Sequence, residues 1–275
     1  IMENNYYLEF EDEFRGDREK IIDALSIYDP LIETIIHDNP SPKLIDIGCG
    51  RGEFIQKWKN KIDNCWGIEF DKGMIKYCKE HNLNIIEGDA LDRLSELGND
   101  TVDVITIFHM IEHLEHYRLH ELIQHCFRVL TNNGILILET PSIDSLLVST
   151  NSFYIDPTHI NPIHPDSICF DIKSVGFSNV EKFYIHGGPL EDASPLKITR
   201  ILNGVAQDLS IIAIKSEEMC EILMKKKSYW EPKLDIGITT LKAAIDYYEN
   251  EAITIDKIET GLSVASLRAS TPEDK

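Results

Sequence analysis

The sequence has 275 residues and 43% hydrophobic residues, which suffices for one large domain, alone or with an appendage. The formal net charge is −20. This charge argues against binding to nucleic acid or to an anionic membrane surface, because both require a basic footprint. The six cysteines form no C-x-x-C pair, so we expect reduced cysteines in a cytoplasmic protein. We expect no signal peptide and no transmembrane segment, since no apolar run is long enough.

Residues 1–42 are predicted to form an arm and a helix ahead of the first strand. Apolar residues recur at helical spacing from Ile21 to Ile36, and Pro30 is expected to kink or split this helix. A breaker cluster, residues 39–42, precedes the first strand. The arm would either fold over a ligand as a lid or simply cover the sheet, and the sequence leaves both open.

A glycine-rich turn follows the first predicted strand, residues 43–47. Gly48, Gly50 and Gly52 allow a sharp turn and a close approach to a ligand, where a Cβ would clash. The helix expected from about Glu53 would point its free N–H groups at that ligand. The turn departs from the dinucleotide fingerprint and from the P-loop, because Glu53 replaces the third glycine and no Lys-Ser/Thr follows. An ordinary strand-to-helix turn is the simpler interpretation.

Acidic residues follow the next two predicted strands, residues 65–70 and 84–86. Glu69 ends the second strand, at the position that reaches ribose hydroxyls in doubly wound folds. Asp89 follows the third strand, where a carboxylate can accept a hydrogen bond from an adenine amine. A solvated acid and a plain turn are the alternatives.

The alternation of strands and helices continues through residue 140. The fourth strand is predicted at 102–108, and a helix then runs to a stop signal at 131–134. The fifth strand is predicted at 135–140. This alternation predicts a parallel sheet with helices on both faces and a ligand at the carboxyl ends of the strands.

The rest of the chain is less regular. We expect residues 142–170 to be an irregular, functional segment, with a helix capped at 165–167. Further strands are expected at 180–185 and 209–214, the last one antiparallel. We therefore divide the chain into an arm (1–42), a main domain (43–215) and a C-terminal helical extension (216–275).

The extension combines a charged helix, 217–230, with an apolar 3–4 repeat from Ile238 to Ile255. That repeat would either dock on its own domain or mediate self-association. The tail after Leu267 is expected to be disordered.

The motifs in residues 43–140 resemble motif I and its companions in class I S-adenosylmethionine (SAM) methyltransferases. They are Asp46-x-Gly48-x-Gly50-x-Gly52, Glu69, Gly88-Asp89-Ala90 and the strand end at 109–114. The resemblance implies a Rossmann-like, mostly parallel doubly wound sheet, SAM as cofactor and S-adenosylhomocysteine as product. The residues that we expect to bind the cofactor are Arg15, Asp46, Gly48, Cys49, Gly50, Gly52, Glu69, Phe70, Met74, Gly88, Asp89, Ala90 and His109.

A second set of segments points to a narrower group within these methyltransferases: 10–16, 48–53, 108–114, 138–141 and 153–159. The set is similar to bacterial methyltransferases of surface-polysaccharide synthesis, including the bifunctional methyltransferase–kinase that caps O-antigen chains. It implies methyl transfer to the non-reducing terminal sugar of a glycan, on a hydroxyl or on a terminal phosphate. The chain departs from that type because no kinase motifs follow.

This resemblance also implies a setting for the protein. We expect a cytoplasmic protein, peripheral to the inner membrane through polysaccharide-synthesis partners that contact its C-terminal helix. Two other interpretations remain open: a small-molecule O-methyltransferase acting on a quinone-like phenol, and a non-catalytic SAM-binding scaffold.

Methyl transfer to a sugar hydroxyl requires a base, and histidine titrates near neutral pH. We predict His113 and His159 as bases, with Glu112 and Asp156 orienting them. Tyr154 and His159 are expected on the substrate side.

The run His109-x-x-Glu112-His113 also spells the inverted zinc-protease motif. We reject a protease, because His109 ends a strand and does not share a helix face with His113. No resident metal is expected, although a divalent ion held by these three residues and His159 stays open.

Overall fold

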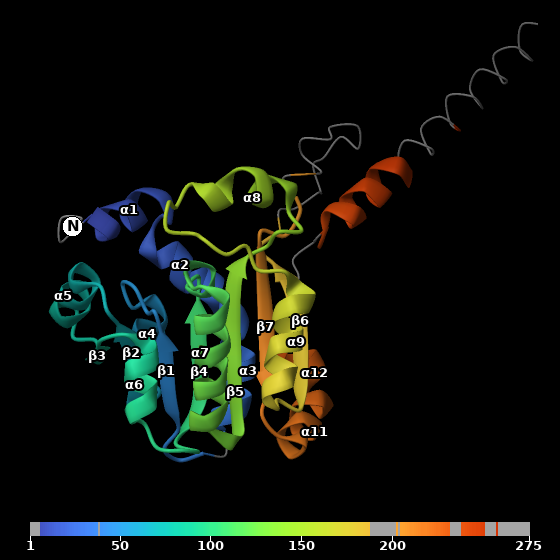
Figure 1. Ribbon diagram of the computed structural model, residues 1–275. Helices are drawn as coiled ribbons and strands as arrows, with labels where there is room; N and C mark the ends of the chain where they lie inside the picture. Colours follow the sequence, from blue (N-terminus) through green and yellow to red (C-terminus); the bar gives the residue numbers. More distant parts are fainter. Residues whose placement is uncertain are drawn as a thin grey trace, which may run out of the picture.

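The computed structural model describes residues 6–37, 39–187, 202, 204–231, 238–250 and 257. Its strands belong to one seven-stranded sheet in the order β3-β2-β1-β4-β5-β7-β6, with helices on both faces (Figure 1). The strands are β1 (Lys43–Ile47), β2 (Asn64–Glu69), β3 (Ile85–Glu87), β4 (Val102–Phe108), β5 (Leu130–Pro141), β6 (Asn179–Ile185) and β7 (Asp208–Ile214).

Strand β7 is antiparallel to its neighbours β5 and β6, and the other neighbouring strands pair in parallel. The strand order reverses between β1 and β4, which opens a crevice at the carboxyl ends of these strands. The predicted Rossmann-like fold with one antiparallel strand is confirmed.

Most of the helices form two layers, one on each face of the sheet. The helices are α1 (Tyr6–Phe14), α2 (Arg18–Ala24), α3 (Asp29–Ile36), α4 (Glu53–Trp58), α5 (Lys72–Glu80), α6 (Ala90–Glu96), α7 (His116–Val129), α8 (Leu146–Thr150), α9 (Pro165–Val175), α11 (Glu217–Lys225) and α12 (Lys227–Trp230). Helices α1 and α8 lie beyond the carboxyl ends of the strands (Figure 1). Short 3₁₀ turns are η1 (Leu25–Tyr28), η2 (Ile111–His113) and η3 (Ser152–Tyr154).

Each layer buries an apolar stripe against the sheet. In α7 the buried residues are Leu119, Leu122, Ile123, Cys126 and Val129, a spacing of three or four that keeps them on one helix face. They join α6 and α9 in one core cluster, and η1, α3, α4, α11 and α12 pack into the other. The sheet is thus buried on both faces, as its apolar parallel strands require.

Three expectations about element boundaries are wrong. Helix α7 ends at Val129, just before the predicted stop at 131–134, but these four residues already belong to β5, which was expected to start at 135. The ladder accounts for this, because Leu130 pairs with Val102 before the register shifts. The segment 142–170, predicted to be irregular ahead of its capped helix, contains α8 and η3, and the charged helix at 217–230 is interrupted at Lys226. The helix predicted from 165–167 is confirmed as α9.

The helical arm is split as Pro30 predicted, because η1 precedes α3 and Pro30 lies in the first turn of α3. Helix α1 was not predicted. Residues 241–250 are helical, and Ala244 of this helix packs on Val205 and Ile238. The start of the 3–4 repeat thus contacts its own chain, whereas Ile255 and the tail after Leu267 lie outside the described residues.

No helix in the part of the chain that the structure describes is both long enough and apolar enough to cross a membrane.

Candidate active site

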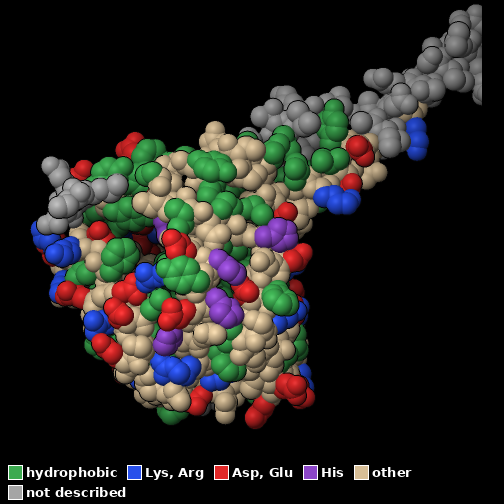
Figure 2. All heavy atoms as spheres, in the orientation of Figure 1, with side chains coloured by type: hydrophobic (Ala, Val, Ile, Leu, Met, Phe, Trp, Pro, Cys, Tyr) green, Lys and Arg blue, Asp and Glu red, His purple; other side chains and the backbone are tan. Residues whose placement is uncertain are grey.

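A cavity of about 760 Å³ lies at the carboxyl ends of β1, β2 and β4. The molecular surface is hollowed there beneath α1 (Figure 2). Most of the predicted cofactor residues line this cavity: Arg15, Gly48, Gly50, Glu69, Phe70, Met74, Gly88, Asp89, Ala90 and His109. Segments from five parts of the chain therefore meet at one hollow.

The glycine loop brings backbone to the cavity wall. Gly48 and Gly50 have φ values of +65° and +52°, in the left-handed region that favours glycine. A Cβ at Gly48 would lie 2.7 Å from Cγ of Met110. The loop therefore needs glycine both for its turn and for the space beside it.

Glu69 is fixed by the loop that it faces. Its carboxylate accepts hydrogen bonds from the N–H groups of Gly50 (2.9 Å), Phe70 (2.8 Å) and Asp71 (2.8 Å). Burial raises the pKa of Glu69, although these three bonds act in the opposite direction. The carboxylate is thus held at the cavity wall before any ligand arrives.

Asp89 has two partners already. It caps α6 by accepting from the N–H of Leu91, and Arg118 donates to it at 2.6 Å. It still lines the cavity, together with Arg118. Its predicted contact with adenine remains a prediction.

Three predicted cofactor residues, Asp46, Cys49 and Gly52, are not among the residues that line the cavity. Asp46 accepts a hydrogen bond from Thr106 of β4 at 2.7 Å, inside the sheet. Burial raises the pKa of Asp46 to about 7. These positions shape the loop from behind.

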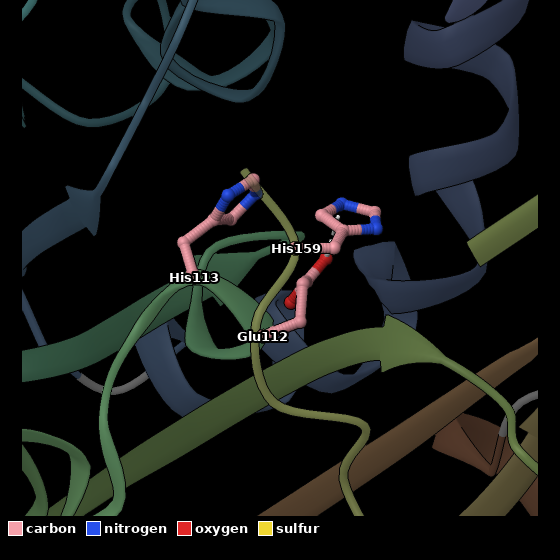
Figure 3. Close-up of side chains that lie close together, drawn as sticks. All are labelled: Glu112, His113 and His159. Carbon is pink, nitrogen blue, oxygen red and sulfur yellow. Dashed lines mark ion pairs between the residues drawn. The ribbon is translucent and has the colours of Figure 1, made fainter. Parts of the chain in front are cut away.

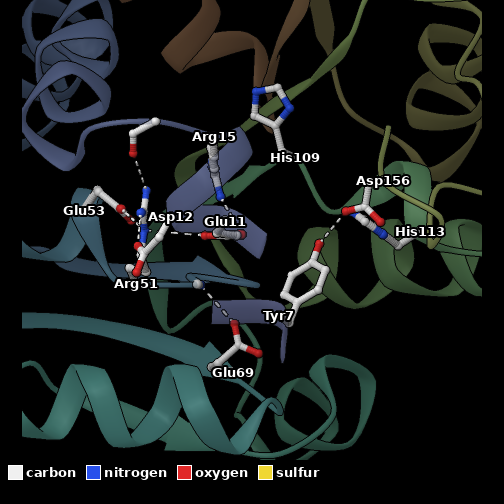
Figure 4. A network of polar contacts seen from close by, with 12 residues as sticks. Tyr7, Glu11, Asp12, Arg15, Arg51, Glu53, Glu69, His109, His113 and Asp156 are labelled. Carbon is white, nitrogen blue, oxygen red and sulfur yellow. Dashed lines mark hydrogen bonds and ion pairs between the residues drawn. The ribbon is translucent and has the colours of Figure 1, made fainter. Parts of the chain in front are cut away.

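Helix α1 lies over the cavity, and Tyr7, Glu11 and Arg15 line it (Figure 4). Arg51 of the glycine loop anchors this helix by donating to Asp12 at 2.7 Å. Arg15 donates to Glu11 at 3.1 Å. Both interpretations of the arm describe part of it, because α1 lies over the site whereas η1 and α3 cover the sheet.

A chain of hydrogen bonds crosses from α1 to His113 (Figure 4). The Tyr7 hydroxyl donates to Asp156 at 2.8 Å, and the Thr158 hydroxyl donates to the other oxygen of Asp156 at 2.6 Å. Because the Thr158 proton is used there, its oxygen accepts from Nδ1 of His113 at 2.9 Å. The proton on Nδ1 leaves Nε2 of His113 with a free lone pair. Thr158 was not predicted as a site residue, although it lies between two residues that were.

Glu112, His113 and His159, which we name the histidine cluster, lie together at this end of the cavity (Figure 3). Nδ1 of His159 donates to the carbonyl of Phe153 at 2.7 Å, so its Nε2 is free and lies 3.8 Å from Oε1 of Glu112. The rings of the two histidines are 4.7 Å apart. The sequence prediction that these residues share a site is consistent with this geometry.

A second polar group lies behind His109, at the ends of β5, β6 and β7. Nε2 of His109 is 3.2 Å from Glu139, and Tyr28 donates to the other oxygen of Glu139 at 2.6 Å. Nδ1 of His186 is 2.8 Å from Asp208. Sequence reasoning missed these residues, apart from His109, because isolated polar residues in separate strands carry no local signal.

The charges in this second group stabilise one another. Burial alone would lower the pKa of His109, but Asp208, Glu112 and Glu139 outweigh it and raise this pKa well above its usual value. Burial alone would raise the pKa of Glu139, but His109 and His186 lower it to about 2. Pairing therefore dominates over burial here.

Tyr154 does not line the cavity, and 64% of its surface is exposed. His159 and Asp156 reach the cavity through His113 and Thr158 and do not line it themselves. The predicted substrate contact of Tyr154 remains a prediction.

Comparison with known proteins agrees with this geometry. Residues 45–138 match the family described as "Methyltransferase domain". The structure of a SAM-dependent methyltransferase from Archaeoglobus fulgidus is 32% identical, with a TM-score of 0.64; the match covers 76% of this chain and 99% of that one. The chain belongs to the SAM-dependent methyltransferases. The cofactor of this family is SAM.

Other relatives are similar over less of their sequence or structure. The mitochondrial ubiquinone biosynthesis O-methyltransferase of Saccharomyces cerevisiae is 30% identical over 132 residues. The match covers 44% of this chain and 41% of the yeast protein. Phosphoethanolamine N-methyltransferase 2 of Haemonchus contortus, solved with SAM, shares the fold at 13% identity and a TM-score of 0.52; the match covers 79% of this chain and 61% of that one.

The cavity of this methyltransferase suits SAM. Glycine backbone borders one wall, and Met74 provides an apolar surface. Oε2 of Glu69 accepts one hydrogen bond and keeps a lone pair for a ribose hydroxyl. Arg15 lines the same cavity and is placed to meet a carboxylate.

Proposed function

We propose that the protein transfers the methyl group of SAM to a hydroxyl oxygen at the non-reducing terminal sugar of a bacterial surface polysaccharide such as O-antigen. The observation that supports O-methylation is the histidine cluster. Each of its two histidines has a free lone pair on Nε2, and His113 lines the cavity. When bound, SAM supplies an electrophilic methyl carbon on a sulfonium. A hydroxyl is a weak nucleophile and must lose its proton as it attacks.

The remaining tasks are alignment and exclusion of water. In this proposal Glu69 and Arg15 hold the ribose and the carboxylate of the cofactor. Helix α1 covers the cavity, and the contact between Tyr7 and Asp156 joins this cover to the segment that follows β5. Glu112, His113 and His159 activate the hydroxyl, and Asp156 orients His113 through Thr158.

The charge of the site favours a hydroxyl over a terminal phosphate. Glu112 and Asp156 lie at this end of the cavity, whereas Glu139 and Asp208 behind it are paired with His109 and His186. Carboxylates at this distance repel a phosphate dianion. The glycan itself is supported by the resemblance of five separate sequence segments to polysaccharide methyltransferases and by the exposed ring of Tyr154.

A small phenol is the second candidate acceptor. The similarity to the yeast ubiquinone biosynthesis O-methyltransferase supports it. The two candidates share a hydroxyl nucleophile and differ in the size and polarity of the acceptor.

The test measures transfer of labelled methyl from SAM to three acceptor types: short glycans with free hydroxyl ends, the same glycans with a terminal phosphate, and catechol-like phenols. We expect transfer to the hydroxyl-ended glycans. His113→Ala and His159→Ala should lower transfer at least about 100-fold, the typical contribution of acid–base groups, and leave SAM affinity unchanged by calorimetry. The matched control is His116→Ala, since His116 is an exposed histidine at the start of α7.

Transfer to phenols alone would replace the glycan with the second candidate. Transfer only to phosphorylated ends, or full activity in both histidine variants, would refute the proposed role of the cluster.

A further inference from the structure

The histidine cluster has the features of a cation site. One potential ligand atom from each of Glu112, His113 and His159 lies within 4.8 Å of the other two. We propose that these three residues bind a first-row divalent cation such as Zn²⁺ or Mn²⁺. The role of this cation rests on the proposed function, but its binding does not.

The strongest sign is a buried carboxylate oxygen that accepts no hydrogen bond. The Glu112 side chain is 0% exposed. Thr140 donates to Oε2, but Oε1 has no hydrogen bond. Its nearest nitrogens, Nδ1 of His109 and Nε2 of His159, are 3.6 and 3.8 Å away. Oε1 therefore has only these loose ion pairs and no hydrogen bond, which leaves part of its burial uncompensated, and a cation between Glu112 and the histidines would supply a direct contact.

Both histidines are already oriented as ligands. A histidine that binds a metal usually donates its other ring N–H to a carbonyl or a carboxylate network. Nδ1 of His159 donates to the carbonyl of Phe153, and Nδ1 of His113 donates to Thr158, which in turn donates to Asp156. The free nitrogen in each ring is therefore Nε2.

The neighbouring group of His109, Glu139 and Asp208 is equally compact but is a weaker candidate. Its atoms already have partners, since Tyr28 and His109 occupy the two oxygens of Glu139 and His186 pairs with Asp208. No oxygen of Glu139 or Asp208 is among the unpartnered buried atoms of the described residues.

Two histidines and one carboxylate leave coordination positions open. Because His113 lines the cavity, these positions would face it. An acceptor hydroxyl bound there loses its proton to water more readily. Its oxygen forms the new bond to the methyl carbon, the carbon–sulfur electron pair stays on sulfur, and the cation is unchanged. The histidines then act as ligands and not as direct proton acceptors.

The test is titration of the chelator-treated, dialysed protein with MnCl₂ and ZnCl₂ by calorimetry, together with visible absorption after adding CoCl₂. We expect one cation per chain and a Co²⁺ absorption band. Glu112→Gln keeps the acceptor for Thr140 but loses the charged ligand, and it should weaken binding at least about 100-fold, beyond the effect of losing an outer partner. The matched control is Asp208→Asn in the neighbouring group, which should bind as the wild type does.

Circular dichroism would verify that Glu112→Gln is folded, and His159→Asn provides a second ligand variant. Absence of stoichiometric binding, or equal affinity in both ligand variants and the wild type, would overturn the proposal. Loss of binding in Asp208→Asn alone would move the site to the neighbouring group.

The cation-binding test and the methyl-transfer test can fail independently of each other. Cation binding without methylation of any hydroxyl would refute the proposed function alone. Hydroxyl methylation by protein that binds no cation and ignores chelators would refute the metal site alone.

Discussion

The two ends of the cavity position their polar groups in different ways. At the end formed by β1, β2 and β3, backbone groups fix the polar side chain. The carboxylate of Glu69 accepts hydrogen bonds from three backbone N–H groups. At the end formed by β4 and β5, side chains from α1, η2 and the 142–165 segment meet in the histidine cluster and its hydrogen-bond chain.

The pKa values of the buried carboxylates also differ between the two ends. Burial raises the pKa of Glu69, which accepts from three backbone N–H groups, and that of Asp46, which accepts from the Thr106 hydroxyl. The pKa of Glu139 is lowered, because paired histidines outweigh burial. The first end therefore reuses local backbone geometry that many nucleotide-binding proteins share, whereas the second depends on contacts between distant segments. Variants at one end should therefore change SAM binding, and variants at the other end should change methyl transfer.

The largest expected effect is on stability, from Asp46→Asn. The pKa of Asp46 is raised from 3.8 to about 7 in the folded protein. Between these values the unfolded chain has lost the proton and the folded protein retains it, so rising pH destabilises the wild type. This slope is about 1.4 kcal/mol per pH unit. Asp46→Asn should abolish it, as measured by urea unfolding from pH 4 to 7.5.

The control for this experiment is Asp63→Asn, the same exchange at an exposed position. If Asp46→Asn and the wild type had parallel stability–pH curves, the carboxylate would not be held protonated by burial.

The second prediction tests the cofactor end. Glu69→Gln keeps the shape of the side chain but replaces a charge-assisted acceptor with a neutral amide. A hydrogen bond to a charged group contributes about 1.5–3 kcal/mol, so SAM affinity should fall about 10- to 100-fold in calorimetry. Affinity for SAM equal to that of the wild type would remove Glu69 from the cofactor site. Acceptor KM should not change, which is the contrast with the other end.

Sequence patterns were informative about the first end and much less so about the second. The glycine loop, Glu69 and the exact limits of β4 follow from local spacing and apolar runs. The helix does end just before the stop signal at 131–134, but β5 starts at Leu130 and not at 135, because Leu130 already pairs with Val102 of β4. Tyr7, Thr158 and Glu139 gave no usable signal, since their partners lie 149, 45 and 30 residues away.

The third prediction tests the acceptor end. Thr158→Val conserves shape but removes the acceptor for Nδ1 of His113 and a donor to Asp156. The ring would no longer be oriented, and methyl transfer should fall about 10-fold, as for other outer-shell partners. SAM affinity should stay within about two-fold.

Thr158→Ser is the conservative control and should restore most of the activity, because it returns the hydroxyl. If Thr158→Val lowered SAM affinity and turnover by the same factor, Thr158 would act on the cofactor end, and the separation of the two ends would fail.

The smallest expected effect is at the contact that joins the two ends, Tyr7→Phe. Loss of the hydrogen bond to Asp156 removes about 0.5–1 kcal/mol from the closed position of α1. SAM should therefore dissociate about two- to five-fold faster in stopped-flow fluorescence, with a similar loss of affinity. Tyr6→Phe is the matched control, since Tyr6 is an exposed tyrosine one position earlier in the same helix. Equal dissociation rates in Tyr7→Phe and Tyr6→Phe would mean that Arg51, through Asp12, holds α1 in place without help from the acceptor end.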